Sequence, residues 1–115
     1  MSVKQAVDNQ FLESMEGKHP FLKRMFTVFI SQEPKRIGEI RQAIEDRDME
    51  KLRHLAHALK GGAATMGVTG VRDCCLLLEN ASKNQDMTEA QSLIDTLESE
   101  IQDAYAFMFT FLAEH

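Results

Sequence analysis

The sequence predicts an all-α protein, an antiparallel four-helix bundle with a short extra N-terminal helix. Apolar residues recur at three- and four-residue spacing in every long segment, and no stretch alternates with the period of two typical of a strand. Strong helix formers dominate, whereas the 115 residues contain only 6 Gly and 2 Pro. Because short turns join the amphipathic segments, antiparallel packing is favoured. We expect a single domain over residues 1–115, large enough to bury a core.

The N-terminal helix is expected within residues 1–18, before a bundle over residues 19–113. Ser2 followed by Gln5 fits a capping box, and Gly17 ends the helix. Pro20 suits the first turn of the next helix, whose apolar positions continue to about Glu45. Pro34 interrupts that helix, so the pattern is compatible with either one bent helix or two.

The next helix is expected at about residues 48–66. Asp48 is a good N-cap, and Gly67 is a stop in the left-handed conformation. On a helical wheel one side collects the apolar residues and must face the core. Its members are Leu52, Leu55, Ala56, Leu59, Ala63 and Met66.

Two further helices complete the predicted bundle. After a turn over residues 67–70, apolar positions run from Val71 to Ala81 and include Cys74 and Cys75. A second turn over residues 84–87 leads to a last helix ending near residue 113, with Thr88 and Gln91 as its capping box.

Composition excludes several classes of function. The net charge is −5 and the basic residues are scattered, which argues against nucleic-acid binding. The start, MSVKQAV, lacks the apolar core of a signal peptide, and the most apolar run, residues 107–113, is too short to span a bilayer. The adjacent cysteines are poorly placed for a disulfide and suit the core of a protein in a reducing compartment. We expect a cytoplasmic protein without membrane insertion.

The wheel of residues 48–66 places His57 nearly opposite the core. Gly61, Ala64 and His54 surround it and Lys60 lies on its flank. We interpret Gly61 as a residue that lowers the helix propensity but leaves the imidazole accessible, and Gly62 as a position that allows close helix packing. A neutral imidazole is a nucleophile towards phosphorus, and an ammonium group can stabilise the product. Because no nucleotide-binding loop is present, the pattern indicates a phosphoryl carrier rather than a kinase.

The segment AHALKGGAATMG resembles the signature of the histidine phosphotransfer (HPt) family, with matches at His57, Leu59, Lys60, Gly61 and Gly67. AIEDRDMEKLRHLAH and CCLLLE resemble the preceding and following segments of that family. The similarity extends from about Phe21 to Glu100. It implies a four-helix bundle that carries phosphate on Nε2 of His57 and exchanges it with an aspartate of a receiver domain in a two-component phosphorelay.

The resemblance also implies roles for individual residues. Lys60 would neutralise the phosphoryl group, Gly61 would leave room for it, and Glu79 would hold the Nδ1 proton of His57. Ala64 and His54 would contact the partner. The partners would be receiver domains of response regulators or hybrid sensor kinases, which supply Mg²⁺, while this chain would need no cofactor and act as a monomer.

Alternative interpretations remain at this point. A bundle that binds receivers without carrying phosphate is one, although the intact His57–Lys60–Gly61 set argues against it. Glu50, His54 and His57 have the spacing of a helical metal site, but a solvated face is favoured and no metal is expected. Phe and Met residues near His57 are core residues that can also join a docking patch. The chain is either a free-standing carrier, which Met1 favours, or an excised domain.

Overall fold

The computed structural model describes residues 5–115, apart from the side chain of Glu33. Within this range the chain forms helices only. They are α1 (Asn9–Ser14), α2 (His19–Glu45), α3 (Met49–Thr65), α4 (Thr69–Lys83) and α5 (Met87–Glu114).

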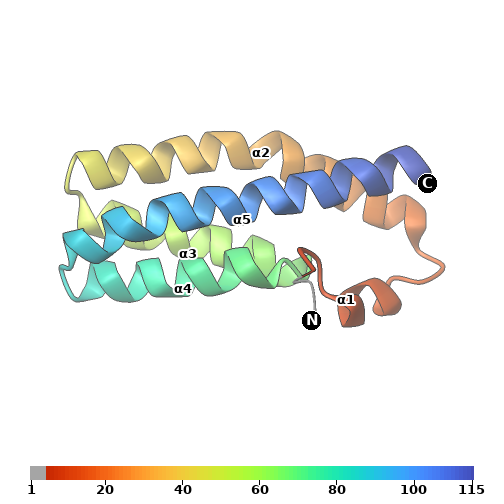
Figure 1. Ribbon diagram of the computed structural model, residues 1–115, viewed down its shortest axis with the longest axis horizontal. Coiled ribbons are helices and arrows are strands. Elements are labelled where there is room, and N and C mark those ends of the chain that lie inside the picture. The colour runs from red at the N-terminus through yellow and green to blue at the C-terminus, as the bar shows by residue number, and fades with distance from the viewer. Residues whose placement is uncertain (1–4) are drawn as a thin grey trace.

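Helices α2 to α5 form a four-helix bundle (Figure 1). Helix α3 packs against α2 and α4, and α5 packs against the same two helices from the opposite side. Because α2 and α5 have 27 and 28 residues and α3 and α4 only 17 and 15, the longer pair extends beyond the shorter one, towards α1 (Figure 1). The predicted fold class is therefore confirmed.

One hydrophobic core runs through the bundle. Its largest fully buried side chains come from the N-terminal segment, from all four long helices and from the α3–α4 turn: Val7, Leu22, Phe26, Phe29, Ile40, Leu52, Leu59, Val68, Leu78, Leu97 and Met108. The predicted apolar face of α3 lies in this core, with Leu55 only partly buried. Cys74 and Cys75 are both buried, as expected for core residues. Within residues 5–115, no helix combines the length and apolar character that a membrane span requires.

The ends of α3 agree with the sequence analysis. The side chain of Asp48 accepts a hydrogen bond from the backbone N–H of Lys51 at 3.1 Å and so caps the helix. Gly67 has a φ of +67°, the left-handed conformation that stops the helix. A Cβ at this position would lie 2.6 Å from Cβ of Phe11, so the close approach of α1 also requires glycine.

The N-terminal helix is shorter than predicted. Ser2 of the proposed capping box lies outside the described residues, and α1 begins only at Asn9. Tertiary contacts explain why residues 5–8 are not helical. Val7 is fully buried, and the backbone N–H of Asp8 donates to the carbonyl of Gly67 at 2.8 Å. The segment before α1 is thus held against the α3–α4 turn.

The structure settles the question left open at Pro34, because α2 is one continuous helix with this proline inside it. Pro34 is exposed, so water can reach the turn that lacks a hydrogen bond. The first turn of α2 contains Pro20, as predicted.

Two expectations for the later helices were wrong. Gly70 belongs to α4, where it is buried, so the α3–α4 turn is shorter than expected. Helix α5 is capped by Asp86, whose side chain accepts from the backbone N–H of Glu89 at 3.0 Å. The proposed cap, Thr88, already lies within the helix, because the earlier aspartate offers a stronger acceptor for the free N–H groups.

Candidate functional site

His57 lies in the middle of α3, on the face opposite the core. Its neighbours Ala56 and Leu59 are fully buried, which fixes the rotation of the helix and turns the imidazole outward. The side chain of His57 is 68% exposed. A macromolecular partner can therefore reach one edge of the ring without any change in the fold.

Glu79 on α4 approaches the other edge of the ring. Its Oε2 lies 3.3 Å from Nδ1 of His57, although the carboxylate itself is only 7% exposed. A carboxylate at this distance favours the tautomer whose proton is on Nδ1, which leaves the lone pair on Nε2. The sequence-predicted pair of His57 and Glu79 is thus brought together across the α3–α4 interface.

Lys60 joins the same carboxylate from α3. Its Nζ lies 2.6 Å from Oε1 of Glu79 as an ion pair, and Lys60 is 26% exposed. Oε1 is buried and the approach lacks hydrogen-bond geometry. The two oxygens of Glu79 therefore serve two different partners, one the nucleophile and the other a cation.

These contacts keep Glu79 ionised despite its position. Burial alone raises the pKa of the Glu79 carboxyl, but Lys60 and then His57 lower that pKa by more. The net result is a pKa below the usual range of a glutamate, because two cationic or proton-donating groups compensate the lost hydration. Ionised Glu79 can accept the Nδ1 proton of His57 as a hydrogen bond at neutral pH.

Sequence reasoning missed the pairing of Lys60 with Glu79. The sequence analysis expected Lys60 to contact the phosphoryl group on His57, and it considered Glu79 only as a hydrogen-bond partner of His57. A signal was present, because Glu79 follows the buried Leu78 and precedes the buried Ala81 and Ser82. A charged residue among buried positions requires a partner of opposite charge.

Glycines on α3 behave differently from one another. A Cβ added at Gly61 would meet no atom within 4 Å, so this position faces open space beside His57. A Cβ at Gly62 would lie 3.5 Å from a guanidinium nitrogen of Arg36, an ordinary van der Waals contact. The close-packing interpretation of Gly62 was therefore wrong, because no neighbouring backbone or core side chain approaches it that closely.

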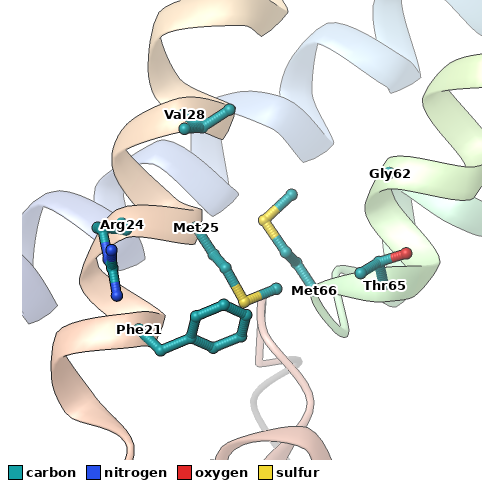
Figure 2. A pocket seen from close by; sticks show the side chains of 7 residues that line it. All are labelled: Phe21, Arg24, Met25, Val28, Gly62, Thr65 and Met66. Carbon is teal, nitrogen blue, oxygen red and sulfur yellow. The ribbon is translucent and has the colours of Figure 1, made fainter.

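A largely apolar pocket of about 470 Å³ lies between α2 and the C-terminal part of α3 (Figure 2). In Figure 2 the side chains of Met25 and Met66 face each other across it, and Phe21 lies at their side. Phe21 and Val28 are about half exposed. Its lining residues are Phe21, Arg24, Met25, Val28, Gly62, Thr65 and Met66. The lining does not include His57, Lys60 or Gly61, so a Phe or Met docking patch near His57 stays a prediction.

The remaining predicted positions lie on the surface of α3. Ala64 is exposed one turn beyond Gly61. His54 is 65% exposed, and its Nε2 lies 3.9 Å from a carboxylate oxygen of Glu50. Over residues 5–115, no three His, Cys, Asp or Glu side chains are grouped so that they could hold a metal ion.

Comparisons with known proteins agree with this geometry. The Hpt domain family model matches residues 24–107. The chain is 29% identical over 82 residues to multistep phosphorelay regulator 1 of Schizosaccharomyces pombe, covering 67% of this chain and 28% of that protein. It is 32% identical over 75 residues to the phosphorelay intermediate protein YPD1 of Candida albicans, covering 65% and 41%. The chain thus spans less than half the length of these relatives.

A solved structure extends the similarity to the whole fold. The histidine-containing phosphotransfer protein B (HptB) of Pseudomonas aeruginosa superposes with a TM-score of 0.91 at 23% sequence identity, over 98% of this chain and 99% of that one. At this identity the match establishes a shared fold. Since the family model covers most of the sequence, including the exposed histidine, the lysine and the buried glutamate, this chain belongs to the Hpt domain family.

Proposed function

We propose that this chain carries a phosphoryl group on Nε2 of His57 and exchanges it with the aspartate of a receiver domain in a multistep phosphorelay. The main observation in support is the orientation of the imidazole. The side chain of His57 is 68% exposed, while its Nδ1 lies 3.3 Å from Oε2 of the buried Glu79. Relatives named as phosphorelay intermediates support the same assignment.

The chemistry follows from that arrangement. Glu79 accepts the Nδ1–H of the neutral ring, so Nε2 presents a lone pair to solvent. Attack by Nε2 on the phosphoaspartate forms the N–P bond and breaks the O–P bond, and the aspartate carboxylate leaves. The reverse step returns the phosphoryl group to an aspartate, with neutral imidazole as the leaving group. Lys60 lies within one helical turn and offsets negative charge on the phosphoryl oxygens.

The partner supplies the rest of the machinery. We propose that the receiver brings Mg²⁺ and its acidic pocket, whereas this chain contributes the nucleophile and a docking surface and has no kinase activity of its own. Gly61 leaves space for the receiver at the phosphoryl group. Ala64 and His54 flank this space on α3, and the pocket between α2 and the C-terminal part of α3 offers further apolar contacts. A transient complex with a monomeric carrier fits this small, open surface.

Label transfer from a phosphorylated receiver domain, with Mg²⁺ present, tests the proposal. Wild type and His57→Gln are compared with His54→Gln, a matched control because His54 is also exposed on α3. We expect acid-labile label on wild type and on His54→Gln and none on His57→Gln. Binding without transfer, from several receivers, would instead indicate a docking module that carries no phosphate.

A further inference from the structure

Glu79 makes two contacts that serve opposite ends of the proposed reaction. Oε2 meets Nδ1 of His57 at 3.3 Å, and Oε1 meets Nζ of Lys60 at 2.6 Å. The first contact prepares the nucleophile. The second contact holds the ammonium group of Lys60, which would otherwise stabilise the phosphoryl group on His57. The same carboxylate therefore favours phosphorylation through His57 and disfavours it through Lys60.

The ammonium group of Lys60 cannot contact both Glu79 and a phosphoryl group on His57 without weakening one of the two contacts. Lys60 and His57 are three residues apart on α3, so a phosphoryl group on Nε2 lies within reach of Nζ. A phosphoryl group carries about two negative charges and strong acceptor oxygens. Glu79 cannot leave, because its carboxylate is 7% exposed and its helix is packed on both sides. Because Lys60 forms an ion pair with Glu79, its positive charge is less available to the phosphoryl oxygens.

We propose that Glu79 limits how strongly the phosphoryl group is held on His57, by competing with it for Lys60. This inference rests on the proposed phosphorylation of His57. The carboxylate acts as a positioning residue: it never touches the phosphoryl group, and it acts through the lysine. A carrier that must pass its phosphoryl group on benefits from such a restraint, because product held too firmly is transferred slowly.

Competition has a signature that hydrogen bonding to His57 lacks. If Glu79 acts through Lys60, removing its charge strengthens the lysine–phosphoryl contact only while the lysine is present. If Glu79 acts only through Nδ1 of His57, the effect of removing its charge is the same with or without Lys60. A double-mutant cycle separates the two routes.

The test measures the half-life of the phosphorylated protein alone, by ³¹P NMR at neutral pH. Phosphoramidate serves as the phosphoryl donor: Nε2 attacks phosphorus, the N–P bond of the donor breaks, and ammonia leaves and takes up the surplus imidazolium proton. Wild type, Glu79→Gln, Lys60→Met and the double variant are compared. Lys51→Met is the matched control, since it removes an exposed charge from the same helix.

We expect Glu79→Gln to lengthen the half-life on the order of two- to fivefold, the range of a partly exposed ion pair. In the Lys60→Met background the same substitution should have no effect, and Lys51→Met should behave as wild type. The comparison is made at a pH at which the ¹³C carboxyl signal shows Glu79 ionised in both backgrounds. An equal effect in both backgrounds, or a shorter half-life in Glu79→Gln, would overturn the competition.

This experiment is independent of any receiver. If phosphoramidate labels His57 but no receiver exchanges with it, the proposed relay function fails while the half-life comparison still decides the role of Glu79. If phosphoramidate leaves His57 unlabelled, both proposals are overturned.

Discussion

Gly61 offers a direct test of the argument that this helix gives up stability for access. An added Cβ would meet no atom within 4 Å, and the residue lies in the interior of α3. Gly61→Ala therefore introduces no clash and removes the entropic cost of glycine, a gain of about 1 kcal/mol in the free energy of unfolding. For a domain of this size that gain corresponds to a rise in Tm of about 3–5 °C.

Gly38→Ala is the matched control. It too lies inside a long helix, α2, and an added Cβ would meet no atom within 4 Å. Urea unfolding should show both alanine variants stabilised to a similar extent. Transfer from a phosphorylated receiver should separate them, because only Gly61 lies one turn from His57.

A larger side chain sharpens the contrast. Gly61→Gln keeps good helix propensity and places a long side chain in the space beside the imidazole. We expect it to lower the transfer rate at least tenfold, about 1.4 kcal/mol in the barrier, while Gly38→Gln leaves the rate unchanged. Wild-type transfer by Gly61→Gln, or a loss of stability in Gly61→Ala, would refute the claim that this glycine is retained for access.

Three further experiments test the fold and the electrostatics of the site. Gly67→Ala should lower the free energy of unfolding by about 2–4 kcal/mol, because it combines a left-handed φ with a contact of 2.6 Å to Phe11; urea denaturation showing a loss of only a few tenths would contradict this. Asp86→Ala should cost about 1 kcal/mol in the same assay and Thr88→Ala much less, since Asp86 caps α5; the reverse order would restore the cap expected from the sequence. Burial raises the pKa of Glu79, but Lys60 and His57 lower that pKa by more, so the folded-state pKa lies below the unfolded value of about 4.3. Ionised Glu79 therefore stabilises the fold above the unfolded pKa, and this contribution is lost as the pH falls through the folded-state pKa. The stability advantage of wild type over Glu79→Gln should therefore shrink between pH 7 and pH 3, and an advantage that is constant across this range would mean that the pKa of Glu79 is the same in the folded and the unfolded protein.

The bundle was predictable because its pattern is local. Apolar spacing, the N-cap at Asp48 and the left-handed Gly67 each depend on a few neighbouring residues, and each has the predicted conformation. The N-terminal segment was not predictable in the same way. Its helical spacing starts at Val3, but burial of Val7 and the hydrogen bond from Asp8 to Gly67 are contacts between distant parts of the chain. Such contacts override local propensity.

The site shows the same division. The exposure of His57 follows from the helical wheel alone, since the opposite face must be buried. The contact of Lys60 with Glu79 joins two helices, and its existence depends on how α3 and α4 are rotated against each other. The apolar pocket between α2 and α3 likewise depends on the spacing of these two helices, which no single helix specifies (Figure 2).

The reactive residues and the residues that line the apolar pocket lie on different pairs of helices. His57, Lys60 and Glu79 all belong to the hairpin formed by α3 and α4, whereas Phe21, Arg24, Met25 and Val28 of the pocket belong to α2. Only α3 contributes to both. On the proposed docking surface, substitutions at the positions of α2 that line the pocket would therefore change partner preference without altering the reactivity of the imidazole. The proposed function thus assigns the chemistry and the choice of partner to different helices, with α3 as the element common to both.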